Sequence, residues 1–216
     1  GLAEQHLTFS GTGGLGLFPW GVLDTHFSER GRQGRLIRLQ NDTQTRFGFG
    51  IDEATALLVA PGQQENGPEV TMEVLGAGGV YIVDNEKAQS TGEGAATSIT
   101  QVSTHYLTRE DKLELKDGNL RTRFAQWKFA PNNNQAPLLN SGDLFERDNY
   151  RQLAQLLCLT QSRQATARAV RVGQGHEIRL YKDLSSYTRE GVFRQPGSET
   201  QYCSYRNLML DIQPAN

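Results

Sequence analysis

The apolar residues of the first part of the chain predict two buried strands joined by a short helix. The run Gly21–Phe27 is apolar until it ends in polar residues, which is typical of a buried strand. Residues 28–40 favour a helix, because Ser28 is a good N-cap and three aliphatic residues follow at helical spacing. Residues 46–51 predict a second strand, in which glycines allow close backbone approach. Strand, helix and strand in this order indicate a parallel βαβ unit.

The remaining pattern predicts several further strands and one more helix. Residues 150–159 predict an amphipathic helix, and residues 70–75 and 80–83 predict a hairpin around Gly76–Gly79. Other strands are expected at 54–59, 99–107, 112–115, 165–172, 177–182 and 207–212, with polar loops at 86–97 and 130–142. We therefore divide the chain into an α/β part, residues 1–130, and a mixed α+β C-terminal extension, residues 131–216.

The predicted βαβ unit brings two ionisable residues to one edge of the sheet. Such units are right-handed, so both strands end on the same edge, where ligands of open α/β sheets bind. His26 lies at the end of the first strand, and Asp52 and Glu53 follow the second. We expect His26 and Glu53 to face a common crevice, although the acidic pair also fits an ordinary strand end.

Composition excludes several classes of function. A net charge of −2 and a pI near 6.1 argue against a general nucleic-acid binder. No run of eighteen apolar residues is present, so no membrane-spanning helix is expected. Cys158 and Cys203 are too few for a thiolate zinc site, and the four histidines form no metal-ligand pair, so we expect neither metal nor cofactor. The two cysteines fit either a disulfide or two buried thiols.

A glycine-rich segment and a histidine–acid pair suggest different chemistries. Gly11–Gly16 matches the dinucleotide pattern in letters, but a second strand rather than a helix follows it, so a loop is favoured and a nucleotide-binding oxidoreductase is the weaker alternative. A histidine with an acidic partner is two-thirds of a nucleophilic triad. The third member is missing, because the chain has no serine elbow and Ser10 only imitates one.

Four segments together resemble the C-terminal half of cyanophycinases, serine peptidases related to peptidase E. They are Gly14–Leu17, Asp24–Phe27, Arg30–Leu36 and Gly48–Ala56. The resemblance implies a class I glutamine-amidotransferase-like α/β fold with a parallel sheet, and a homodimer. It also implies that His26 is the general base and Glu53 the acid of a triad. The serine nucleophile of the family lies upstream of the residues printed here, so we expect it in a missing half or in a separate N-terminal chain.

The same resemblance suggests a substrate. Arg30, Arg32 and Arg35 match family arginines, and guanidinium groups pair well with the carboxylates of an aspartyl peptide such as cyanophycin. A solvated basic helix face is the simpler interpretation of these arginines. Thr25 stands where the family has a substrate-contacting glutamine, which favours an inactive binding or structural paralogue as the alternative. Family members with a long extension suggest export, to the periplasm or the cell exterior.

Overall fold

The structure is a computed structural model that describes residues 9–62, 67–132, 143–171 and 174–215. Its helices are α1 (Gln33–Thr43) and α2 (Asn149–Leu159), with 3-10 turns η1 (Ser28–Arg30) and η2 (Gly94–Ala96). The strands are β1 (Val22–Thr25), β2 (Phe47–Ile51), β3 (Thr55–Pro61), β4 (Val70–Gly76), β5 (Gly79–Asp84), β6 (Gln89–Thr91), β7 (Ser98–Thr108), β8 (Lys112–Lys116), β9 (Asn119–Arg123), β10 (Gln164–Arg171), β11 (Gln174–Gln195) and β12 (Ser198–Pro214).

The strands form two largely antiparallel sheets, so the predicted α/β parallel-sheet fold is wrong. The larger sheet has the order β1-β2-β5-β7-β12-β11-β10, with β6 beside β7, and the smaller has the order β3-β4-β8-β9. Among the strand pairs of the described residues, only β1 with β2 is parallel. After Ile51 most strands follow one another through short turns, and a parallel crossover needs a dozen or more residues. The predicted βαβ unit exists, but its parallel pairing does not extend to the rest of the sheet.

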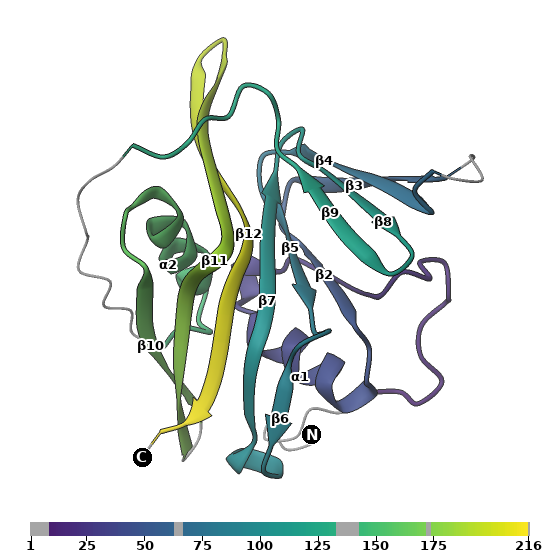
Figure 1. Ribbon diagram of the computed structural model, residues 1–216, viewed down its shortest axis with the longest axis vertical. Helices are drawn as coiled ribbons and strands as arrows, with labels where there is room; N and C mark the ends of the chain where they lie inside the picture. The colour runs from purple at the N-terminus through teal and green to yellow at the C-terminus, as the bar shows by residue number, and fades with distance from the viewer. Residues whose placement is uncertain (1–8, 63–66, 133–142, 172–173, 216) are drawn as a thin grey trace.

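The predicted hairpin of residues 70–83 is also wrong, because its two strands belong to different sheets. β4 pairs with β3 and β8, whereas β5 pairs with β2 and β7. Strands β2 to β5 therefore form one long antiparallel ribbon that bends between the two sheets (Figure 1). On one limb the bend lies at residues 52–54, and on the other at residues 77–78. The bend places Glu53 at the junction of the two sheets.

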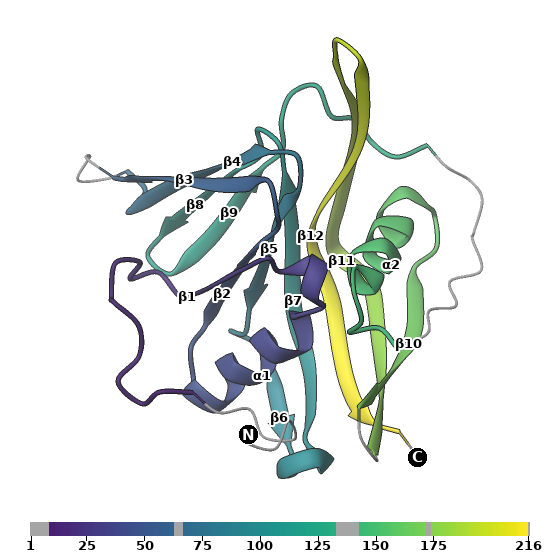
Figure 2. The same cartoon turned by 180° about the vertical axis from the view of Figure 1, so that it is seen from behind.

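The two faces of the larger sheet carry separate cores. Alternate residues of β5 point to opposite faces, so Tyr81 and Val83 pack with α1 and α2, whereas Val80 and Ile82 pack with the smaller sheet. Figure 2 shows both helices on the near side of the larger sheet. The strands β10 to β12 continue this sheet beyond β7, so residues from both sides of position 130 share it.

A disulfide joins the end of α2 to β12. It links Cys158 to Cys203, which are 45 residues apart, so of the two alternatives left open by the sequence the structure contains the bonded one. In the chain-entropy model a closed loop of this length stabilises the fold by about 4 kcal/mol. The bond holds α2 against the sheet at the helix's C-terminal end.

A buried ion pair fastens the turn after β7 to β12. The Lys128 Nζ lies 2.6 Å from Asp111 Oδ1, and neither side chain is exposed. Ser204 Oγ donates to Asp111 Oδ2 at 2.6 Å, and the ammonium also donates to Thr108 Oγ1 at 2.7 Å. Burial lowers the pKa of Lys128, and the attraction of Asp111 offsets this only in part. Removing either partner would leave the other as an uncompensated charge in the protein interior.

We predict that Asp111→Ala destabilises the protein strongly, because it leaves a buried ammonium without a counter-charge. The expected loss in the free energy of unfolding is about 3–5 kcal/mol, measured by urea titration. The control is Glu199→Ala, which removes the exposed pair with Arg194 and costs less than about 1 kcal/mol. Equal losses for the two variants would contradict this role for Asp111.

Candidate functional site

The structure brings together the two residues that the sequence singled out. His26 follows β1 and Glu53 follows β2, and because these strands are parallel both residues lie at the same edge of the sheet. The imidazole Nδ1 lies 2.9 Å from Glu53 Oε1. A carboxylate only accepts hydrogen bonds, so Nδ1 carries a proton, and in the neutral imidazole Nε2 is then the acceptor. Both side chains are about half exposed, at 53% and 54%, so the pair is open to a reactant.

The backbone at both strand ends adopts an uncommon conformation. His26 has φ 50° and Ala54, next to Glu53, has φ 51°, both in the left-handed region that residues with a side chain rarely occupy. Between them, the amide of Phe27 donates to the carbonyl of Ile51 at 3.2 Å, which extends the parallel pairing. Such strain persists only when surrounding contacts impose it, and it concentrates at functional sites.

A glycine and an aromatic ring set the approach of the two strands. Phe27 is fully buried, and its ring lies directly over Gly50 of β2. A Cβ at position 50 would meet the ring atoms of Phe27 at 2.3 Å. The absence of a side chain at position 50 therefore fixes where Phe27, and with it the neighbouring His26, can lie.

Two acidic side chains cross between the segments that carry the pair. Asp52 Oδ1 accepts from the amide of Ser28 at 3.0 Å, and Glu29 Oε2 accepts from the amide of Glu53 at 3.2 Å. Each segment is thus held by a carboxylate of the other. We call these two reciprocal bonds the carboxylate staple. The sequence placed Asp52 at the end of the second strand without a role of its own, and no local pattern pointed to Glu29.

A residue of α2 contacts both carboxylates of the staple. Arg151 Nη1 donates to Glu29 Oε1 at 3.0 Å and to Asp52 Oδ2 at 3.1 Å. Tyr106 donates to the same Asp52 oxygen at 2.6 Å. Burial, followed by the charge of Asp52, raises the pKa of Tyr106 well above its ordinary 10.0, so the phenol stays a neutral donor. No sequence signal pointed to Arg151, since its partners lie about a hundred positions away.

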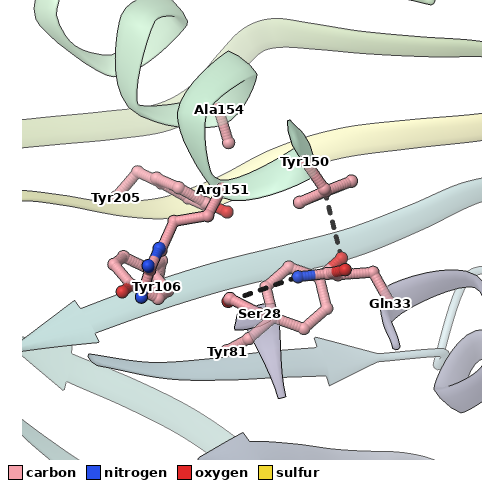
Figure 3. A pocket seen from close by; sticks show the side chains of 8 residues that line it. All are labelled: Ser28, Gln33, Tyr81, Tyr106, Tyr150, Arg151, Ala154 and Tyr205. Atoms are coloured by element: carbon pink, nitrogen blue, oxygen red, sulfur yellow. Dashed lines mark hydrogen bonds between the residues drawn. The ribbon is translucent and has the colours of Figure 1, made fainter. Parts of the chain in front are cut away.

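Buried tyrosines surround this network. Tyr81, Tyr106, Tyr150 and Tyr205 line a small pocket with Ser28, Gln33, Arg151 and Ala154, as Figure 3 shows. Tyr81 donates to the hydroxyl of Tyr150 at 3.0 Å, and Gln33 donates to Ser28 Oγ at 3.3 Å. Ser28 is buried and bonded in this way, and Ser10 is exposed in the loop before β1. Neither serine hydroxyl is hydrogen-bonded to His26.

The predicted substrate-binding residues divide into two kinds. Arg32 forms an ion pair with Asp24 and donates to the carbonyl of Thr25 at 3.1 Å, so its guanidinium is engaged within the protein. Arg30 and Arg35 are exposed, and neither has an ion-pair or hydrogen-bond partner in the described part of the chain. Thr25 is exposed beside His26. Of the three predicted arginines, Arg30 and Arg35 are therefore the ones whose guanidinium groups are unpaired within the described residues.

The described residues lack two kinds of site. Within them, no group of three or more histidine, cysteine or acidic side chains is arranged to hold a metal ion. Neither of the helices in these ranges is long and apolar enough to cross a membrane. The glycines at 11–16 that match the dinucleotide pattern lie in an irregular loop and not between a strand and a helix.

Comparisons with known proteins find partial similarity to cyanophycinases. The chain is 36% identical over 107 residues to the cyanophycinase of Trichormus variabilis, which covers 47% of this chain and 34% of that protein. It is 35% identical over 121 residues to that of Synechococcus elongatus and 32% identical over 94 residues to that of Geminocystis herdmanii. The match spans about a third of the length of these relatives. No family model and no solved structure matches.

We predict that Gly50→Ala disturbs the His26 segment, because the added methyl overlaps the ring of Phe27. Overpacking at such a contact lowers the free energy of unfolding by about 1–3 kcal/mol, measured by urea titration. The control is Gly14→Ala, where a Cβ meets nothing within 4 Å, and it is expected to stay within about 0.5 kcal/mol of the wild type. If the two variants were equally stable, the close packing of Phe27 on Gly50 would be wrong.

Proposed function

We propose that this chain is part of a serine-type hydrolase that cleaves aspartyl peptide bonds. In this proposal His26 is the general base and Glu53 is the acid that orients it. The 2.9 Å bond between Nδ1 and the Glu53 carboxylate carries the proposal, because it orients a half-exposed imidazole and uses Nδ1, so that Nε2 remains for a reactant. The partial similarity to cyanophycinases supports the same reaction class.

The proposed reaction follows the acyl-transfer scheme. Nε2 takes the proton of a serine hydroxyl as its oxygen attacks the peptide carbonyl, and Glu53 stabilises the imidazolium that forms. The imidazolium then gives that proton to the leaving amine as the C–N bond breaks. In the second half-reaction water attacks the acyl-serine carbonyl as Nε2 takes its proton. The ester C–O bond then breaks, the imidazolium returns the proton to the serine oxygen, and the acid product is released. The chain's own residues thus move one proton in each half-reaction.

The nucleophile in this proposal comes from another polypeptide segment, for which the edge of β1 offers a place. In the described residues β1 pairs only with β2, so no strand pairs with its other edge, and Leu23 of this strand is 43% exposed. A neighbouring strand added in parallel would end at the same edge as His26, because the carboxyl ends of parallel strands meet there. The segment that supplies the serine is a separate N-terminal chain or the missing half of the same protein.

Homodimerisation, which the resemblance implies, is also part of the proposal.

Exposed arginines in η1 and α1, the segments that follow His26 in the chain, suit an anionic substrate. Arg30 and Arg35 are free to bind carboxylates through two parallel N–H donors each, whereas Arg32 is engaged with Asp24. Cyanophycin, a poly-aspartate with arginine side branches, or a related Asp-rich peptide fits this arrangement. The disulfide between Cys158 and Cys203 favours an oxidising compartment, such as the periplasm or the cell exterior, as the site of action.

A catalytically inactive member of the same family is the second candidate. Thr25 replaces the glutamine that the resemblance places before the histidine, and no described serine is bonded to His26. Such a protein would keep the exposed arginines as a binding surface for acidic peptides. The two candidates differ in one property, namely whether replacing His26 changes a reaction rate.

We predict that in the complete protein His26→Ala lowers kcat on cyanophycin by at least about 10³-fold, since it removes the proton acceptor. Glu53→Gln should also lower kcat by a large factor, because an amide cannot stabilise the imidazolium. The matched control is His176→Ala on β11, with an expected change of less than about twofold in kcat.

Product release is measured by mass spectrometry of the released peptides. An unchanged rate for His26→Ala rejects the hydrolase assignment. Binding of an Asp-rich peptide without turnover by the wild type selects the inactive candidate.

A further inference from the structure

We infer that Arg151 is a positioning residue, which holds the His26–Glu53 pair in register by bridging the two carboxylates of the staple. The inference rests on the proposed function in that it names a residue acting on the same pair. It assigns to helix α2, which lies more than a hundred positions after His26 in the sequence, a part in the geometry of the site. Figure 3 shows Arg151 reaching from α2 toward Ser28 and Tyr106.

The carboxylate staple carries two negative charges close together. Asp52 is fully buried at its side chain and the Glu29 side chain is only 21% exposed, so two carboxylates meet with little solvent to screen them. Like charges at such a place repel each other strongly unless a cation lies between them. Arg151 is that cation, because a single nitrogen, Nη1, contacts both acids. Without the guanidinium, repulsion would drive the two carboxylates apart. This would weaken their hydrogen bonds to the amides of Ser28 and Glu53.

The guanidinium is itself firmly held. Its second terminal nitrogen, Nη2, lies 2.6 Å from Asp148 Oδ1, one turn earlier on the chain. Although burial alone lowers the pKa of Arg151, Tyr106 and Asp52 together with the other two carboxylates raise it above its ordinary value. The cation is therefore permanent, and three carboxylates fix its position.

A second contact ties the start of α2 to the histidine segment. The amide of Asp148 donates to the carbonyl of Ser28 at 2.9 Å. Before it, the carbonyl of Phe145 packs so closely on Gly31 that a Cβ there would lie 2.1 Å from the oxygen. The end of η1 thus lies against residues 145–148. These contacts fix the start of α2, and with it the position from which the Arg151 side chain reaches the staple.

The staple acts on the pair through backbone atoms. Glu29 holds the amide of Glu53, the acid of the pair, while Asp52 holds the amide of Ser28, two residues after His26. Both His26 and Ala54 are in the left-handed conformation, which relaxes when the contacts that impose it are removed. Loss of Arg151 is therefore expected to break the 2.9 Å bond between His26 and Glu53 without touching either residue.

The experiment reads the imidazole directly by NMR, in this chain and without substrate. Nitrogen-15 chemical shifts of His26 report which ring nitrogen carries the proton, and the signal is assigned by its disappearance in His26→Asn. The variants are Arg151→Leu, Arg151→Lys and Glu29→Ala, with Glu53→Ala as the reference for a lost pair. The control is Arg179→Leu, which removes a partly exposed arginine–aspartate pair between β11 and β12. Amide spectra of each variant establish that it is folded.

We predict that the wild-type imidazole carries its proton on Nδ1, and that Arg151→Leu and Glu29→Ala lose this population as Glu53→Ala does. Arg151→Lys should retain part of it, since it keeps the charge but not the shared geometry. Arg179→Leu should leave the His26 signals unchanged.

Wild-type nitrogen shifts in folded Arg151→Leu overturn the inference. If that variant does not fold, the same result in folded Glu29→Ala overturns it. The spectra are independent of turnover. If the complete wild-type protein does not hydrolyse cyanophycin while Arg151→Leu still disturbs His26, the proposed hydrolase is rejected and the positioning role is kept.

Discussion

A buried carboxylate fixes the place where three distant parts of the chain meet. Asp52 accepts hydrogen bonds from the backbone amide of Ser28, from Tyr106 on β7 and from Arg151 on α2. A charge withdrawn from water is tolerated only when its oxygens are fully paired, so each of these partners must keep its place. The positions of η1, β7 and α2 follow from this requirement, and the half-exposed imidazole depends on all of them.

Local features of the chain could be predicted because short-range chemistry determines them. The parallel pair around α1 follows from its hydrophobic pattern, although the helix begins at Gln33, and Ser28 belongs to a separate 3-10 turn. The helix at residues 149–159 also agrees with the one predicted at 150–159, and an Asp-Gly turn at residues 117–118 joins β8 to β9. At that turn both residues have positive φ, which the Asp-Gly sequence favours.

Long-range features could not be predicted in this way. β11 runs over 22 residues and β12 over 17, yet the pattern indicated only short strands at 177–182 and 207–212, because exposed polar positions interrupt the alternation. Tertiary packing determines the pairing of β12 with β7 and the contact of Arg151 with Asp52. Neither contact produces a recognisable pattern in the neighbouring sequence. A single βαβ unit therefore suggested a parallel sheet that the rest of the chain does not build.

The bent ribbon of β2 to β5 has a mechanical consequence. Glu53 sits in the bend itself, while His26 belongs to the edge of the larger sheet alone. The carboxylate staple ties this bend to the histidine segment, since the amide of Glu53 donates to Glu29. The angle at which the ribbon leaves the larger sheet therefore helps to set the distance between the glutamate and the imidazole.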